Sequence, residues 1–122
     1  MKILITIIIG ACIFGWIVTR PYQQPPTPSV TVTASWYGDE CAGKPTANGE
    51  LFDPSAMTCA MWGVPFDTRV KVRLGPRWVI VRVNDRGPAR RLKRGIDLSE
   101  AAFSKLADTD AGLITVELTI LP

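Results

Sequence analysis

The sequence predicts a mainly β domain, a small closed or nearly closed barrel with one or two short helices. Three stretches, near residues 30–36, 69–83 and 114–120, alternate apolar and polar side chains with a period of two. That alternation is typical of half-buried strands. A single short helical pattern follows Ser99, and glycine-rich connections run between residues 38 and 63. Short strands with so little helix favour a barrel over a layered α/β fold.

The strands can be placed in order along the chain. In residues 30–36, valine, alanine and tryptophan alternate with threonine and serine. Residues 69–73 and 78–83 flank the Gly-Pro turn at 74–77, so they predict a hairpin. Residues 114–120 alternate isoleucine, valine and leucine with threonine and glutamate, which predicts a closing strand.

One helix is predicted to begin after Ser99. Serine is a good N-cap, and Glu100 suits the positive start of a helix. An apolar stripe then recurs at helical spacing, which predicts a face packed on the barrel. Its members are Ala102, Phe103, Leu106 and Ala107.

Residues 1–19 are expected to be a signal peptide or a membrane anchor rather than part of the fold. Lys2 precedes an uncharged apolar run that ends before Arg20, a little short of the ~20 residues that span a bilayer. Residues 9–12 also resemble a lipobox, so lipidation of Cys12 is a third reading. We favour a single anchor with Lys2 inside and the rest exported to the periplasm or cell envelope.

Residues 20–29 form a proline-rich linker that cannot pack a core, and the domain therefore covers residues 30–122. Two cysteines, Cys41 and Cys59, fall in the domain. In an oxidising compartment they could form a disulfide closing a loop of roughly 17 residues, worth about 3 kcal/mol. The alternative is two unpaired buried thiols. No C-x-x-C pair or third ligand accompanies them, so we expect no metal site and no cofactor.

The chain of 122 residues contains no histidine. This excludes Ser-His-Asp and Cys-His nucleophilic sites and histidine zinc ligands. Any acid–base chemistry must therefore fall to carboxylates, tyrosine, lysine or cysteine.

Basic residues are concentrated between Arg69 and Arg94, where ten lysines and arginines accompany a single acidic residue, Asp85. Such a surface favours a polyanion. Export removes nucleic acid as a partner and leaves the outer face of the membrane and the acidic cell wall. Alternatively, the basic residues of the first hairpin strand are simply its solvated face.

Three carboxylates are expected on connections of the barrel. Asp85 follows a strand within Asn-Asp-Arg-Gly-Pro, Glu50 follows the turn pair Asn48-Gly49, and Asp97 precedes the helix. Together they could converge on one cleft and carry acid–base chemistry. Each also has a plain structural explanation, as an ion pair, a solvated side chain or a helix cap.

Six blocks of sequence, taken in order, resemble the rare lipoprotein A (RlpA) family. The resemblance runs from about Thr33 to the C-terminus, and the order of the blocks is more specific than any single motif. It implies a six-stranded double-psi β-barrel, the fold shared with expansins and some cellulases. The blocks are Ala34-Ser35-Trp36-Tyr37-Gly38, residues 46–53 (TANGELFD), residues 57–60 (MTCA), residues 65–70 (PFDTRV), residues 81–88 (VRVNDRGP) and residues 96–102 (IDLSEAA).

The resemblance also implies an activity. The family's studied members resemble lytic transglycosylases, which cleave the MurNAc–GlcNAc bond of peptidoglycan and prefer glycan stripped of stem peptides. An ordinary glycosidase needs two carboxylates. A transglycosylase instead closes a 1,6-anhydro ring with the substrate's own C6 hydroxyl, so one well-placed acid/base suffices.

Carried over by position, the resemblance assigns roles to individual residues. Asp85 is the expected general acid and then base, and Glu50 positions groups or stabilises positive charge. Asp97 is a second candidate acid. The family's third site residue is a histidine, and Met61 stands at its position, where it cannot move a proton. The expected substrate-binding residues are Trp36, Tyr37, Asn48, Arg86 and Met61, although Trp36 could equally belong to the core.

Two functions remain open. The motif order favours a peptidoglycan lytic transglycosylase, whereas the missing histidine favours a non-catalytic, expansin-like module that binds peptidoglycan. A tethered inhibitor or scaffold without glycan affinity would leave the motifs unexplained. For the enzyme and for the binding module alike, we expect a monomer attached to the membrane through its N-terminal segment. The expected partner is the peptidoglycan glycan strand, and we expect no nucleic acid.

Overall fold

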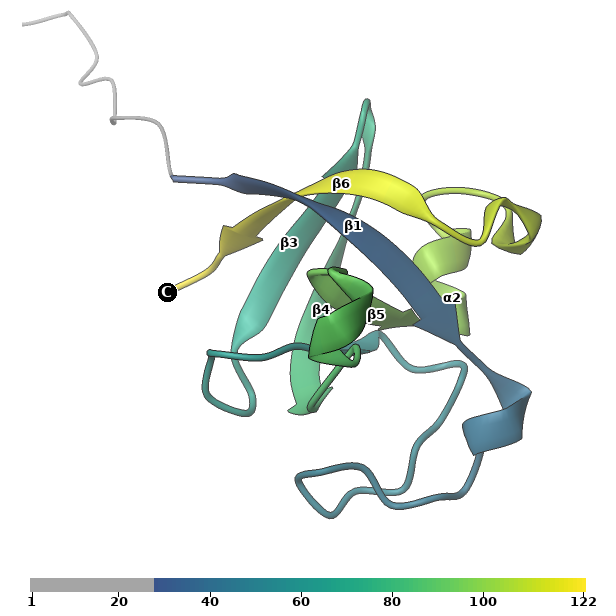
Figure 1. The fold of residues 1–122 in the computed structure, drawn as a ribbon. Coiled ribbons are helices and arrows are strands. Elements are labelled where there is room, and N and C mark those ends of the chain that lie inside the picture. Colours follow the sequence, from purple (N-terminus) through teal and green to yellow (C-terminus); the bar gives the residue numbers. More distant parts are fainter. Residues whose placement is uncertain (1–27) are drawn as a thin grey trace, which may run out of the picture.

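The computed structural model describes residues 28–122, which form a closed six-stranded barrel (Figure 1). The predicted segment 1–19 and most of the predicted linker 20–29 lie outside the described residues. No helix of the described part is long and apolar enough to cross a membrane. The strands are β1 (Val30–Tyr37), β2 (Thr58–Ala60), β3 (Arg69–Leu74), β4 (Arg77–Asp85), β5 (Ile96–Ser99) and β6 (Ile114–Ile120).

The strand order around the barrel is β1-β5-β2-β4-β3-β6. β1 pairs with β5 and β2 pairs with β4 in parallel, and the other neighbours are antiparallel. Closure removes both sheet edges. The core inside the barrel is built mainly from valine, leucine and isoleucine, with Phe103 of the helix beside them.

The predicted mainly β barrel and its three alternating stretches are confirmed. Residues 30–36 lie in β1, the hairpin is β3 and β4 with Leu74 opposite Arg77, and residues 114–120 are β6. The sequence did not predict β2 and β5, because neither is long enough to show a sustained alternation of apolar and polar side chains. They have only three and four residues, and all of β2 is buried, so the period of two is not visible in them.

The predicted helix is α2 (Glu100–Ser104), and Ser99 caps it. The Ser99 Oγ accepts a hydrogen bond of 3.2 Å from the Ala102 amide. α2 is shorter than the predicted stripe, because Leu106 is buried in the turn that follows the helix instead of within it. Three 3-10 turns complete the fold, at Asp39–Cys41, Arg90–Leu92 and Thr109–Ala111.

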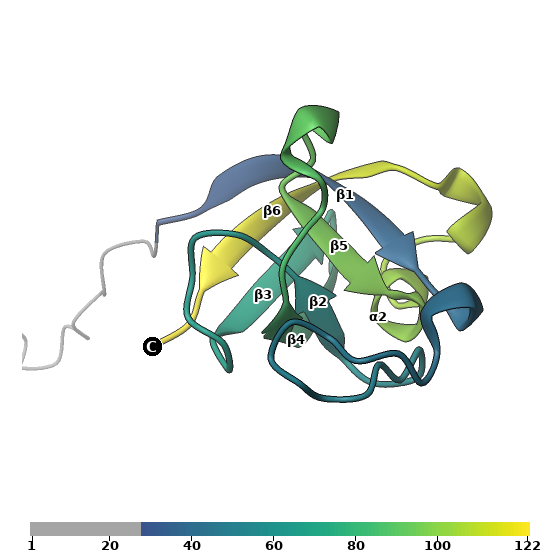
Figure 2. The same ribbon diagram turned by 60° about the horizontal axis from the view of Figure 1, so that its bottom comes forward.

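The long connection between β1 and β2 lies across one end of the barrel (Figure 2). Its turn at residues 46–50 touches the end of β4, because the Asn48 amide donates to the Asn84 carbonyl at 3.3 Å. This connection also carries Cys41. The predicted disulfide is not formed in the structure, where Cys41 and Cys59 are both free. Cys59 is fully buried in the barrel core, whereas Cys41 lies on the 3-10 turn that lines an open cleft.

Candidate active site

Two of the predicted carboxylates lie in one row across the barrel wall. The register places Asp85 of β4 beside Ala60 of β2, and Ala60 beside Asp97 of β5. Ser35 of β1 continues the row next to Asp97. Because neighbouring strands lie ~4.8 Å apart, the two aspartates are about 10 Å apart along the row. The methyl group of Ala60 between them leaves space for a ligand.

A cleft of about 260 Å³ opens over this row. β4 and β5 supply the two carboxylates, and the connection after β1 supplies the opposite wall. The cleft is lined by Tyr37, Cys41, Lys44, Pro45, Thr46, Phe52, Ala60, Asp85, Arg86 and Asp97.

Asp97 is the carboxylate whose surroundings favour a bound proton. Partial burial in the cleft raises its pKa to about 6, because a buried carboxylate loses hydration. A hydrogen bond of 3.2 Å from the Ser35 hydroxyl and the charge of Arg94 act against this shift, and the nearby Asp85 adds to it. Asp97 therefore exchanges a proton close to neutral pH, as a general acid must. It lies within β5, not on the connection where it was expected.

Asp85 is held in place by the backbone. Its Oδ1 accepts hydrogen bonds from the amides of Ala47, at 2.9 Å, and Arg86, at 2.8 Å. No donor of the described residues is placed on its Oδ2. The turn at residues 46–50 thus fixes one carboxylate oxygen of Asp85, while the other is available to a ligand in the cleft.

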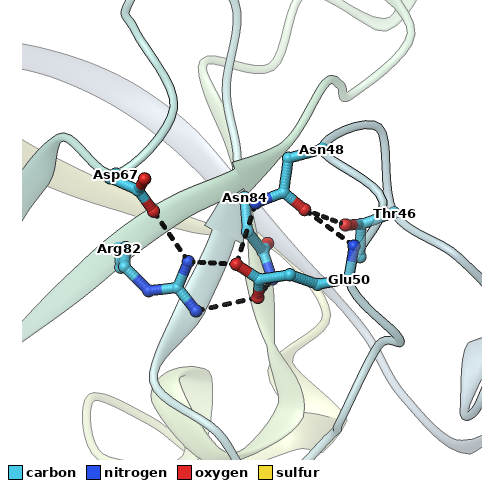
Figure 3. A network of polar contacts seen from close by, with 6 residues as sticks. All are labelled: Thr46, Asn48, Glu50, Asp67, Arg82 and Asn84. Atoms are coloured by element: carbon cyan, nitrogen blue, oxygen red, sulfur yellow. Dashed lines mark hydrogen bonds and ion pairs between the residues drawn. The ribbon is translucent and has the colours of Figure 1, made fainter.

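Glu50 belongs to a separate polar network on the outer side of β4 (Figure 3). Its two oxygens accept from the Arg82 guanidinium at 2.6 and 2.8 Å, which is a bidentate ion pair. Asn48 and Asn84 also donate to Glu50, and Arg82 donates to Asp67 at 3.0 Å. The Arg82 hydrogen bonds lower the Glu50 pKa to about 2.

The sequence predicts that three carboxylates converge on one cleft. The structure places two of them there, Asp85 and Asp97. Strand alternation directs Arg82 and Asn84 to the outer face of β4, where they meet Glu50. Asp85, the next residue, is directed to the cleft. Glu50 influences the cleft through the turn at residues 46–50, which contacts both Asn84 and Asp85.

The two neighbouring aromatic residues of β1 have different surroundings. Trp36 packs against Phe103, with ring centroids 6.4 Å apart, and its indole N–H donates to the Thr109 carbonyl at 3.0 Å. It does not line the cleft. Tyr37 does, but its ring stacks on Phe52 at 4.3 Å. Its hydroxyl is buried and has no hydrogen-bond partner among the described residues.

The other predicted binding residues are largely engaged. The Asn48 side chain holds its own turn, by accepting from Thr46 at 2.6 Å and donating to Glu50 at 2.9 Å. Arg86 lines the cleft and donates to the Met61 carbonyl at 3.0 Å. Met61 is half-buried and packs against the core, directly beside the end of β4.

Arg82 was missed as a site residue. Its signal in the sequence is the Arg-x-Asn pattern in β4, which puts Arg82 and Asn84 on one face of the strand next to Glu50. The buried Tyr37 hydroxyl could not be found from sequence, because it depends on Phe52 covering the ring. Within residues 28–122, no group of three or more cysteines or acidic residues is placed to hold a metal ion.

The closed six-stranded barrel is the domain of a family of lytic transglycolases. The chain belongs to the lytic transglycolase family, whose model matches residues 29–118. It is 50% identical over 93 residues to a probable endolytic peptidoglycan transglycosylase RlpA of Nostoc, an alignment that covers 72% of this chain and 24% of that protein. An RlpA of Pseudomonas aeruginosa is 46% identical over 88 residues, covering 70% and 26%. The chain spans about a quarter of the length of these relatives.

Two solved structures share the fold. The Streptomyces papain inhibitor has a TM-score of 0.65 and 27% identity, covering 81% of this chain and all of that one. An expansin of Clavibacter michiganensis, solved in complex with cellohexaose, has a TM-score of 0.61 and 21% identity, covering 78% and 51%. These matches, with the family match, confirm the predicted double-psi barrel and the resemblance to the RlpA family.

Proposed function

We propose that the chain is a peptidoglycan lytic transglycosylase that cleaves the MurNAc–GlcNAc bond and leaves 1,6-anhydroMurNAc ends. The names of its relatives support the substrate. The observation that carries the reaction is the row Asp85–Ala60–Asp97, in which two carboxylates flank a small residue on the floor of one cleft.

Asp97 is the general acid of this proposal. Its raised pKa, about 6, keeps a useful protonated fraction at neutral pH. It donates that proton to the glycosidic oxygen, which leaves as the 4-hydroxyl of GlcNAc when its bond to C1 of MurNAc breaks. The Ser35 hydroxyl, which donates to Asp97 Oδ1, orients the carboxyl group.

Asp85 is the base. Its free Oδ2 takes the proton from the C6 hydroxyl of MurNAc as that oxygen bonds to C1 and closes the anhydro ring. No water is consumed, and the two aspartates exchange their protonation states, which solvent then restores. The role that the sequence assigned to Asp85 alone is thereby divided between two residues. Tyr37 also lines the cleft, and its buried hydroxyl would donate to the sugar once strand binding uncovers it.

Glu50 is a positioning residue in this mechanism. Its pKa of about 2 and its bonds to Arg82 keep it ionised and occupied, so it is unsuited to donate a proton. Its carboxylate accepts from the Asn48 side chain and so fixes the turn at residues 46–50, whose Ala47 amide holds Asp85.

The test is to incubate the purified full chain with peptide-free glycan strands and analyse the products by mass spectrometry. We expect fragments with 1,6-anhydro ends, and Asp97→Asn and Asp85→Asn chains that release almost none. Asp110→Asn, an exposed carboxylate on the 3-10 turn at Thr109–Ala111, is the matched control and should cut normally. Reducing ends without anhydro sugar would indicate hydrolysis, and strand binding without fragments would exclude the enzyme.

A second candidate is a peptidoglycan-binding module that does not cut. Met61, at the position where the family resemblance expects a histidine, favours it. If the wild-type chain binds strands without cutting, Met61→His tests this reading. Cleavage gained by that single change would identify the missing histidine as the cause.

We further propose that residues 1–19 direct export and tether a monomeric domain, residues 30–122, to the membrane. Carbonate extraction of the cell envelope tests the tether, because an anchored chain stays in the membrane fraction whereas a cleaved one is released. Light scattering of the purified domain tests the monomer.

A further inference from the structure

Two loops leave the cleft floor side by side and are held together by stacked cations. They follow Ala60 of β2 and Asp85 of β4, which are paired in register. The Arg86 guanidinium lies 3.9 Å from the Phe66 ring centroid and also donates to the Met61 carbonyl. The loops therefore form one ordered surface next to the cleft.

Trp62 is the exposed element of this surface. Its side chain is fixed, because the indole N–H donates to the Pro88 carbonyl at 2.7 Å. The Arg90 guanidinium lies 4.6 Å from the indole centroid, yet 40% of Trp62 remains exposed. Trp62 is two residues beyond Ala60, which places it about 7 Å along an extended chain from the cleft floor.

The loop that follows Asp85 carries only positive charge, whereas the loop that follows Ala60 contains one acidic residue, Asp67, which is paired with Arg82. Arg86, Arg90, Arg91, Lys93 and Arg94 lie between residues 86 and 94, and that stretch contains no acidic residue. Arg90, Arg91 and Lys93 are exposed. A ligand suited to it combines an apolar ring face for the indole with an anionic group for the guanidinium.

We propose that Trp62 and Arg90 form a subsite for a carboxylate-bearing sugar unit of the glycan strand, one step along from the cleft. The proposal rests on the proposed function for the identity of the strand. Trp62 stacks against the pyranose ring, and Arg90 pairs with the carboxylate. That carboxylate comes from the lactyl group of peptide-free MurNAc or from the stem peptide of substituted strands.

The molecule contains a matched control for this subsite. Trp78 is 56% exposed and has Lys71 5.0 Å from its ring centroid, so it too is an exposed tryptophan beside a cation. It lies near the start of β4, whereas Asp85 is at the end. Seven residues of strand separate them by about 23 Å. A general affinity of exposed aromatic and basic residues for the wall would involve both tryptophans.

The experiment measures binding by the full chain carrying Asp97→Asn, so that the strands stay intact. Three soluble probes are used: peptide-free strands, the same strands with their lactyl carboxylates amidated, and peptide-bearing strands. We expect an acidic probe to bind about tenfold more tightly than the amidated one, which is the scale of one charge-assisted hydrogen bond. Preference for peptide-free strands assigns the lactyl group, and preference for peptide-bearing strands assigns the stem peptide.

Variants then decide the roles. Arg90→Gln should abolish the preference for the acidic probe and leave binding of the amidated probe unchanged. Trp62→Leu should weaken all three probes about tenfold, and Trp62→Phe, which keeps a ring, should weaken them less. Trp78→Leu and Lys71→Gln should change nothing. Equal binding of acidic and amidated strands, or equal losses in the Trp62 and Trp78 variants, would overturn the proposal. This experiment measures binding and not cleavage. A wild-type chain that fails the cleavage test would therefore refute the proposed enzyme activity and leave the subsite proposal intact.

Discussion

Glu50 and Asp97 are two carboxylates of one small domain in opposite surroundings. Glu50 lies outside β4 in a bidentate ion pair with Arg82, and its pKa falls to about 2. Asp97 lies in the cleft with one hydroxyl donor, and partial burial raises its pKa to about 6. The structure thus separates a carboxylate that organises the turn from one that can exchange a proton at physiological pH.

The largest expected difference between these two carboxylates comes from removing the acidic group of Asp97. Asp97→Asn keeps the size of the side chain but not its proton, so we expect the rate of anhydro-product formation to fall at least about 100-fold. The Glu50→Gln chain, measured alongside, should retain much more activity, because Glu50 does not line the cleft. Equal losses in both variants would contradict the separation of their roles.

A smaller kinetic effect is expected from Tyr37→Phe. The Tyr37 hydroxyl is buried in the cleft without a partner among the described residues, so its loss costs the free protein little. If it hydrogen-bonds the sugar, KM should rise about tenfold while kcat changes little. Steady-state kinetics with peptide-free strands, together with thermal melting, measure both quantities. A variant with unchanged KM would remove Tyr37 from the site.

Sequence predicted the parts of this site that depend on strand order and missed those that depend on side-chain direction. Asp85 was expected directly after an alternating strand, and it is the last residue of that strand, β4; the blocks around it carry the family resemblance. Glu50 was expected in the same cleft, because its sequence does not reveal that Arg82 would draw it to the outer face. Likewise, nothing local distinguishes Trp36 from Tyr37, although one packs against the helix and the other lines the cleft.

The Glu50–Arg82 pair can be tested by stability. Glu50→Gln removes the charge but keeps an acceptor, and the pair is more than one-third exposed, so solvent weakens it. We expect a loss of about 1 kcal/mol at pH 7, or a Tm about 5 °C lower. The matched variant Glu117→Gln, which is joined to Arg73 by a single contact instead of two, should lower Tm less. Equal shifts would mean that the network around Glu50 adds nothing to an ordinary surface pair.

The smallest expected effect is a difference in how stability depends on pH. The Glu50 pKa is lowered from 4.5 to about 2, so its contribution is present above pH 4.5 and is lost as the pH falls towards 2. The Asp97 pKa is raised from 3.8 to about 6, so folding favours its protonated form, and stability is lost as the pH rises from about 4 to 6. Asp97→Asn should therefore add up to about 1 kcal/mol at pH 7, after allowance for its partial exposure, and nothing at pH 3.5.

Urea unfolding at a series of pH values from 2.5 to about 7.5 measures these slopes directly. In the Asp97→Asn chain, the free energy of unfolding should no longer fall as the pH rises from about 4 to 6. In the Glu50→Gln chain, the fall in the free energy of unfolding as the pH drops below 4.5 should be smaller than in the wild type. Each variant thus serves as the control for the other. If Asp97→Asn leaves the slope near pH 5 unchanged, Asp97 is not the carboxyl group that holds its proton towards neutrality, and Asp85 would have to be the acid as well as the base.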